Sequence, residues 1–252
     1  IRHSITKMSH FHFCCHEDYR KRIIQLGEHQ KNIYLVGGMG VEYIKRIRLL
    51  KKKTLEKQID FQFSHKNLLV TFHPVTLEKN TAKKQFENLL YALDKLKDTK
   101  IIFTMPNSDT EGRIIQKLII NYVKKNTHKS TFFTYMGQKK YLSCLKYVDA
   151  VVGNSSSGIA EAPSFKICTV NIGDRQKNRV QANSIINCKP EKKPILKSLK
   201  KIYSKKFKKV LSKVVNPYEP KRKILPSKTA VSVFKKVILK NILKKSFNDL
   251  KF

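Results

Sequence analysis

The sequence has few cysteines for disulfides or metal sites and no apolar run long enough to cross a membrane. Its 252 residues include no tryptophan and only five cysteines, none of them in a CxxC pair or at a zinc-type spacing. An odd, scattered set of cysteines is typical of a reducing compartment. No apolar run approaches the roughly 18 residues of a membrane span, and no signal peptide is visible. We therefore expect a cytoplasmic protein with no membrane partner.

Acidic residues are scarce as well: 18 Asp and Glu stand against 53 Lys and Arg, a net charge of +35. Such an excess raises nucleic acid as a partner. The cations, however, are mostly lysines spread along the chain, and a sequence rich in Lys, Asn, Ile and Phe also follows from AT-biased coding. We expect a solvated basic surface and no nucleic-acid partner, with non-specific binding through residues 189–245 as the alternative.

Motifs for metals and dinucleotides are weak. His10, His12 and His16 are the best metal candidates, but no carboxylate or cysteine accompanies them at a suitable spacing. The run from Gly37 to Gly40 follows an expected strand, yet it lacks the GxGxxG pattern and favours a tight turn. We therefore expect neither a metal nor a cofactor.

Hydrophobic periodicity predicts an α/β fold. Strands expected at 67–72, 100–104, 131–134, 149–152, 168–172 and 184–188 alternate with helices, including 81–97, 110–125, 138–146 and 158–164. This alternation indicates parallel sheets with helices on both faces. Before it we expect strands at 10–15 and 32–36 and a polar connector at 54–66; after it we expect Lys-rich helices and a last helix at 229–245.

Polar residues follow five of the expected strands. In an open parallel sheet, ligands bind beyond the carboxyl ends of the strands, so these residues are expected on one rim. They are His73 to Thr76, Pro106 to Asp109, Tyr135 to Gly137, Asn154 to Ser157, and Gly173 to Gln176.

The stretch VVGNSSSGIAEAPS, residues 151–164, is expected to form a strand, a polar turn and the start of a helix. Unpaired amides and the helix dipole there favour a phosphate. The alternative is that Ser155, Ser156 or Ser157 simply caps the helix. His73, Arg175 and Glu161 likewise have ordinary explanations as a loop histidine, a surface arginine and a solvated carboxylate. Taken together, these groups suit a nucleoside diphosphate, with the carboxylate on the sugar diol.

Six stretches carry a resemblance to a known family, and they span about residues 2 to 188. They are RHSITKMSHFHFCCHEDYRKRIIQLGE, VGGMGV, LLVTFHPVTLE, FTMPNSDTEGR, YLSCLKYVDAVVGNSSSGIAEAPSF and NIGDRQKNR. In combination they resemble the UDP-N-acetylglucosamine 2-epimerase family, in its hydrolysing branch for sialic- or legionaminic-type sugars. The resemblance implies the two Rossmann-like domains of a GT-B fold, a UDP-sugar substrate and a homo-oligomer.

The resemblance also implies roles for individual residues. His73 would contact the diphosphate and assist its departure, Arg175 would lie near it, and Ser155 and Ser156 would hold the phosphates. Glu161 would accept the ribose hydroxyls. Asn107 would line the nucleotide site, and the backbone of Met136 would border the uracil.

The family's reaction eliminates UDP from the sugar in the anti sense and then adds water with inversion at the second carbon. It needs carboxylates as base and acid, which the family carries just before the segment that matches Arg2 and His3. We therefore expect residues 1–60 to be the end of a first Rossmann-like domain, 61–215 a UDP-binding domain, and 216–252 a basic helical tail.

Two departures leave a second hypothesis open. The expected carboxylates precede the matched segment, and Asn216-Pro217-Tyr218 is followed by Glu219 without the family's glycine-rich turn. The alternative to an enzyme is therefore a catalytically inactive remnant that binds UDP or oligomerises with an intact relative.

Overall fold

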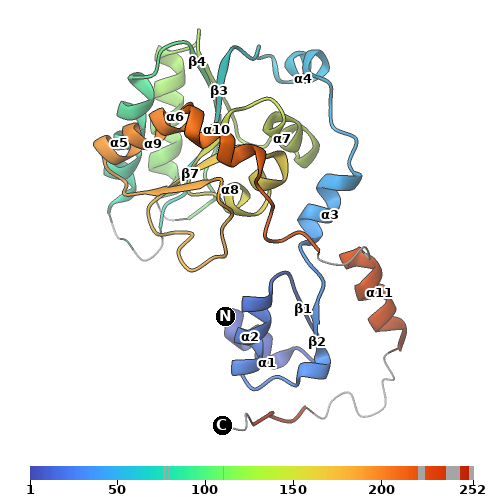
Figure 1. Cartoon of the computed structure of the whole chain (residues 1–252). Coiled ribbons are helices and arrows are strands. Elements are labelled where there is room, and N and C mark those ends of the chain that lie inside the picture. The colour runs from blue at the N-terminus through green and yellow to red at the C-terminus, as the bar shows by residue number, and fades with distance from the viewer. Residues whose placement is uncertain (76–77, 79, 110, 221–224, 237–244, 250–252) are drawn as a thin grey trace. The chain divides into compact units, whose positions relative to one another are not determined.

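The computed structural model describes residues 1–75, 78, 80–109, 111–220, 225–236 and 245–249. It divides into two compact units: unit 1 comprises Ile1–Arg46 with Pro217–Phe252, and unit 2 comprises Ile47–Asn216. Both units contain parallel strands and helices (Figure 1), which confirms the predicted α/β class. The predicted three-part division at residues 60 and 215 stays a prediction.

Unit 2 is built on one six-stranded sheet in the order β5-β4-β3-β6-β7-β8. All five pairings are parallel. The chain builds β3, β4 and β5 outward to one edge and then returns to place β6 beside β3, so the topological switch point lies between β3 and β6. The strands are β3 (Lys66–Thr71), β4 (Thr99–Thr104), β5 (Ser130–Phe133), β6 (Ala150–Gly153), β7 (Cys168–Ile172) and β8 (Ile185–Cys188).

Helices cover both faces of this sheet, because its central strands are apolar on both sides. Leu68, Val70 and Phe72 share one buried cluster with Phe86 of α5 and with residues of α6 and α9, whereas α7 and α8 lie on the other side (Figure 1). The helices are α4 (Lys52–Ile59), α5 (Ala82–Asp94), α6 (Gly112–Lys125), α7 (Gln138–Leu145), α8 (Ser156–Ala160), α9 (Lys192–Ile202) and α10 (Lys205–Ser212).

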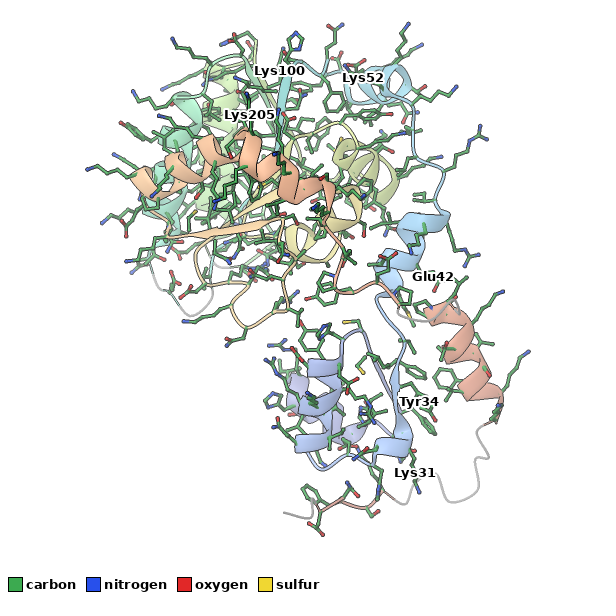
Figure 2. All side chains as sticks on the ribbon, in the orientation of Figure 1. Lys31, Tyr34, Glu42, Lys52, Lys100 and Lys205 are labelled. Atoms are coloured by element: carbon green, nitrogen blue, oxygen red, sulfur yellow. The ribbon has the colours of Figure 1, made fainter. Side chains whose placement is uncertain are left out.

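The basic surface of unit 2 is spread over several elements (Figure 2). Lys52 on α4 lies 3.8 Å from the carboxylate of Glu56, and Lys100 on β4 donates to the main-chain oxygen of His128 at 2.6 Å. Lys205 is the first residue of α10. The labelled lysines therefore lie on three different elements, and two of them have protein partners.

Unit 1 contains one parallel pair, β1 (His12–Cys14) and β2 (Ile33–Leu35). The carboxylate of Glu42 on α3 accepts hydrogen bonds from the main-chain nitrogen and the hydroxyl of Ser227 at the start of α11. These bonds lower the pKa of Glu42, as a helix N-terminus does for a nearby anion. The helices are α1 (Arg2–Met8), α2 (Glu17–Gln25), the short 3-10 turn Gln30–Asn32, α3 (Met39–Arg46) and α11 (Pro226–Lys236).

Two predictions along the chain need correction. The connector expected at 54–66 is wrong in its first half, because α4 covers Lys52–Ile59 and buries Leu55 and Ile59 one turn apart; two apolar positions among polar ones hid this helix. The last helix, expected at 229–245, begins earlier, at Pro226. Its expected residues 237–244 lie outside the described residues, and Lys245 is not helical.

A buried carboxylate ties the ends of unit 1 together. Glu28 is 2 % exposed and forms ion pairs with Lys7 at 2.8 Å and with Lys245 at 2.7 Å. The Glu28 carboxylate also contacts Nε2 of His12, at 2.9 Å. Burial alone would raise the pKa of Glu28, but the hydrogen bonds from Lys245, Lys7 and His12 outweigh it and lower the pKa to about 2. A buried charge is retained where it is paired in this way.

Replacing Lys245 with methionine should lower the free energy of unfolding by about 1–2 kcal/mol. The Lys245 ammonium also lies within 3.2 Å of the main-chain oxygens of Thr6 and Lys7, which are acceptors in the last turn of α1. Urea denaturation measures the loss. Lys236→Met, at an exposed cation on α11, is the matched control. Equal effects of the two substitutions would contradict the proposed role of Lys245.

Candidate functional site

Two strand ends meet at the switch point of unit 2. Thr71 of β3 pairs with Gly153 of β6, and the chain continues into His73 on one strand and Asn154 on the other. Gly153 has a φ of +130°, and a Cβ at this position would lie 1.9 Å from the main-chain oxygen of Thr71. Only glycine permits this approach, so Gly153 lets the two polar strand ends lie side by side.

The imidazole of His73 is held in one orientation. Its Nδ1 accepts a hydrogen bond from the main-chain nitrogen of Asn107 at 3.1 Å, so the proton of the neutral ring lies on Nε2. Burial, together with the positive charge of Arg175, lowers the pKa of His73 to about 4. At neutral pH the ring is therefore uncharged and carries an N–H donor at Nε2.

Asn107, Asp109 and Arg175 surround this ring. Asn107 Nδ2 donates to the carboxylate of Asp109 at 2.6 Å, and Arg175 Nη1 donates to the main-chain oxygen of Asn154 at 3.1 Å. Burial lowers the pKa of Arg175, and the negative charge of Asp109 opposes that shift. The guanidinium stays charged at neutral pH, and its positive charge acts on the neutral ring of His73. We call His73, Asn107, Asp109, Asn154 and Arg175 the His73 group.

The helix that follows the serine-rich turn Ser155–Ser157 is shorter than the sequence predicts, and the turn forms hydrogen bonds within itself. α8 has five residues and is followed by the 3-10 turn Ala162–Phe165, so no regular helix spans 158–164. Ser155 Oγ accepts from the main-chain nitrogen of Ser157 at 3.3 Å, as the capping alternative expects. Ser156 opens α8. Because α8 is short, its dipole is small, and the cationic and N–H donors of the His73 group matter more for an anion.

Glu161 and Met136 flank this rim. The hydroxyl of Ser157 donates to the carboxylate of Glu161, which positions that carboxylate at the end of α8. Met136 follows β5, is buried, and accepts a hydrogen bond at Sδ from Cys144 at 3.6 Å. This contact joins Met136 to α7, so its predicted place beside the uracil stays a prediction.

Two residues at the site were not singled out by the sequence pattern. Asn154 and Gln176 both lay within the five polar segments that follow the strands, but neither was given a role. Gln176 Nε2 donates to the main-chain oxygen of Asn154 at 2.8 Å. Both side chains are almost fully buried. A buried amide must have partners, but burial at these positions could not be deduced from the sequence alone.

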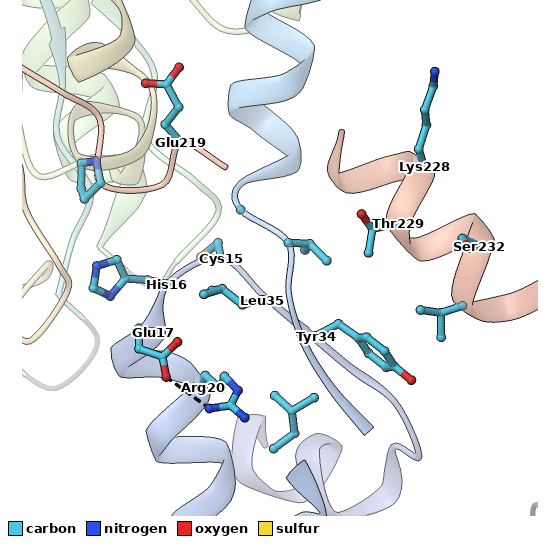
Figure 3. A pocket seen from close by; sticks show the side chains of 15 residues that line it. Cys15, His16, Glu17, Arg20, Tyr34, Leu35, Glu219, Lys228, Thr229 and Ser232 are labelled. Atoms are coloured by element: carbon cyan, nitrogen blue, oxygen red, sulfur yellow. Dashed lines mark hydrogen bonds and ion pairs between the residues drawn. The ribbon is translucent and has the colours of Figure 1, made fainter. Parts of the chain in front are cut away.

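Unit 1 has a cavity of its own, of about 720 Å³, at the carboxyl ends of β1 and β2 (Figure 3). Glu17 and Arg20 form an ion pair at 3.3 Å on its wall, and Cys15, Tyr34 and Ser232 also line it. The mixed lining contains no group of metal ligands among the residues that the structure describes.

Two of the three histidines considered as metal ligands have protein partners, whereas the buried Nε2 of the third, His10, has no hydrogen-bond partner among the described residues. His12 pairs with Glu28, and His16 Nδ1 accepts from the main-chain nitrogen of Asp18 at 3.2 Å, which caps α2. Among the described helices, none combines the length and the apolar character needed to cross a membrane.

Comparisons with known proteins agree with the resemblance. Residues 1–222 match the family model described as UDP-N-acetylglucosamine 2-epimerase. The protein of Campylobacter jejuni named GDP/UDP-N,N'-diacetylbacillosamine 2-epimerase (hydrolyzing) is 42 % identical over 250 residues, which cover 99 % of this chain and 64 % of that protein. Polysialic acid biosynthesis protein P7 of Escherichia coli is 36 % identical, covering 99 % of this chain and 63 % of its own length.

A solved structure shows the same fold. The UDP-GlcNAc 2-epimerase from Neisseria meningitidis bound to UDP-GlcNAc matches with a TM-score of 0.75 and 17 % identity, covering 92 % of this chain and 63 % of that one. This likeness confirms the predicted GT-B-like fold class. The chain spans less than two thirds of the length of the curated relatives it matches. Because the family match and both relatives extend over most of its residues, the chain belongs to the UDP-N-acetylglucosamine 2-epimerase family.

Proposed function

We propose that unit 2 binds the UDP portion of a nucleotide sugar and that its diphosphate lies against the His73 group. The observation that carries this proposal is the paired geometry of His73 and Arg175. One presents an oriented neutral N–H, and the other presents a guanidinium whose charge acts on that ring. A diphosphate offers acceptor oxygens and negative charge to both, and hydrogen bonds between charged partners are the stronger kind.

The remaining predicted residues complete the nucleotide site in this proposal. Ser155 and Ser156 contribute hydroxyl and main-chain donors to the phosphates, and Asn107 lines the site next to His73. Glu161, positioned by Ser157, accepts the ribose hydroxyls. The backbone of Met136 borders the uracil. The structure of the Neisseria meningitidis relative is named as bound to UDP-GlcNAc, which supports a nucleotide sugar as the ligand class.

The proposed reaction is hydrolysing 2-epimerisation of UDP-N-acetylglucosamine or of a 2,4-diacetamido analogue. A base removes the proton from the second carbon of the sugar while the bond from the first carbon to the diphosphate oxygen breaks, which leaves an unsaturated sugar and UDP. Water then adds to the double bond with inversion at the second carbon. His73 stabilises the departing diphosphate through Nε2–H.

We assign no residue of this chain to the proton transfer at carbon. The two carboxylates placed at the site have other hydrogen-bond partners: Asp109 accepts from Asn107, and Glu161 accepts from Ser157. We expect the 252-residue polypeptide to bind UDP without releasing N-acetylmannosamine from UDP-N-acetylglucosamine.

Calorimetric titration with UDP, UMP and uridine tests the proposed binding. UDP should bind most tightly and uridine most weakly, because only the phosphates reach His73 and Arg175. Equal affinities for UDP and uridine would overturn the proposal. A chromatographic assay for free N-acetylmannosamine in the same samples separates binding from turnover.

A further inference from the structure

We propose that Asn154 is the positioning residue of this site and that it sets the location of both His73 and Arg175. This role rests on the proposed function, since it concerns how the diphosphate donors are aimed. Asn154 itself is only 1 % exposed, so it acts through its neighbours and not by touching the ligand.

The side chain of Asn154 forms two hydrogen bonds with the backbone of His73. Its Oδ1 accepts from the main-chain nitrogen of His73 at 2.7 Å, and its Nδ2 donates to the main-chain oxygen of His73 at 2.8 Å. The amide therefore continues the pairing of β3 and β6 by one more residue, after the strands themselves have ended. Asparagine can do this because its side chain carries one donor group and one acceptor group, as the backbone does.

The backbone of Asn154 binds the loop after β7, which carries Arg175. Its nitrogen donates to the main-chain oxygen of Thr71 at 3.1 Å, which anchors it to the sheet. Its oxygen accepts from Arg175 Nη1 at 3.1 Å and from Gln176 Nε2 at 2.8 Å. One buried residue thus joins the end of β3 to the loop that follows β7.

The consequence is that the His73 ring is located by two independent contacts. Asn154 fixes its backbone, and the main-chain nitrogen of Asn107 fixes Nδ1. The orientation of the remaining nitrogen, Nε2, is then fixed as well. Arg175 is held by the same residue, through the main-chain oxygen of Asn154. A donor that is already oriented loses less conformational entropy when the ligand binds, so its hydrogen bond contributes more to the affinity.

Asn67, at the start of β3, offers a matched comparison within the same unit. Its side chain also binds one backbone from two sides: Oδ1 accepts from the main-chain nitrogen of Ser64 and Nδ2 donates to its oxygen, each at 2.8 Å. Asn67 is 5 % exposed and lies at the amino end of β3, whereas Asn154 lies beside the carboxyl end. Replacing either asparagine by alanine leaves two main-chain groups without their partner.

The experiment compares Asn154→Ala with Asn67→Ala in the 252-residue chain. Both should lose stability, but only Asn154→Ala should weaken UDP binding, by about tenfold, with uridine affinity unchanged. In NMR titrations of the free proteins, Asn154→Ala should raise the pKa of His73 from about 4 toward the ordinary value, because the ring becomes more hydrated. Asn67→Ala should leave the titration of His73 as in the parent chain.

The NMR readout needs no nucleotide, so it tests the positioning role even if UDP fails to bind and the proposed function falls. If Asn154→Ala does not fold, the uncharged substitution Asn154→Ser keeps one hydrogen-bonding group and removes the two-sided pairing with the His73 backbone. A folded Asn154 variant with parental UDP affinity and an unchanged His73 titration would overturn the proposal, as would equal effects of the Asn154 and Asn67 substitutions.

Discussion

Replacing His73 with alanine should weaken UDP binding about 100-fold while the affinity for uridine changes less than about twofold. Hydrogen bonds to charged groups contribute about 1.5–3 kcal/mol, and each 1.4 kcal/mol is about a factor of ten in affinity. The loss should fall on the diphosphate because His73 Nε2–H is the oriented donor at the switch point. Calorimetry with both ligands measures the difference.

Two further variants sharpen this result. His65→Ala removes an exposed histidine near the amino end of β3 and should leave both affinities unchanged. His73→Gln retains an amide N–H and should recover part of the lost UDP affinity. Equal losses of UDP and uridine in His73→Ala would remove the proposed phosphate role, since uridine has no phosphate to lose.

Glu161→Gln should weaken UDP and uridine together, by about 30-fold, and should reduce the preference for a ribose over a 2'-deoxyribose. The carboxylate is held by the hydroxyl of Ser157, and an ionised carboxylate accepts from both ribose hydroxyls, whereas a glutamine has one acceptor oxygen. Titration with UDP, uridine and 2'-deoxy-UDP measures the pattern.

This pattern is the reverse of the one expected at His73, because the ribose is common to UDP and uridine. Glu87→Gln, at an exposed carboxylate on α5, is the control and should change neither affinity. A Glu161→Gln variant that loses UDP affinity but keeps its uridine affinity and its preference for ribose would place Glu161 elsewhere than on the sugar.

The strands that position the site could be predicted from the sequence because their short, apolar runs are typical of buried parallel strands. The run Leu68 to Phe72 is buried on both faces of a parallel sheet, and such strands are continuous apolar runs. The polar residues that follow must then lie at the carboxyl rim. The resemblance to the 2-epimerase family was visible partly for the same reason, since four of its six stretches contain these strand ends.

The remaining contacts depend on pairings between distant parts of the chain. That Asn154 binds the backbone of His73 follows from the register of β6 on β3 and from the close approach at Gly153, neither of which has a local pattern. Likewise, among so many lysines, nothing in the sequence distinguishes Lys245 as a partner of the buried Glu28.

The central claim is that His73 meets the diphosphate of UDP, and NMR titration of its imidazole with and without UDP tests it most directly. In the free protein the ring should titrate with a pKa of about 4 and carry its neutral proton on Nε2. Because the ordinary pKa is about 6.5, the folded state binds this proton less tightly than the unfolded chain. Stability should therefore fall as the pH decreases from about 6.5 to about 4.

Saturating UDP should raise the pKa of His73 well above its value in the free protein, because the phosphate charge favours the imidazolium, while uridine should leave it unchanged. The Nε2 resonance should shift with UDP alone. A His73 pKa that is the same with and without saturating UDP would contradict the account.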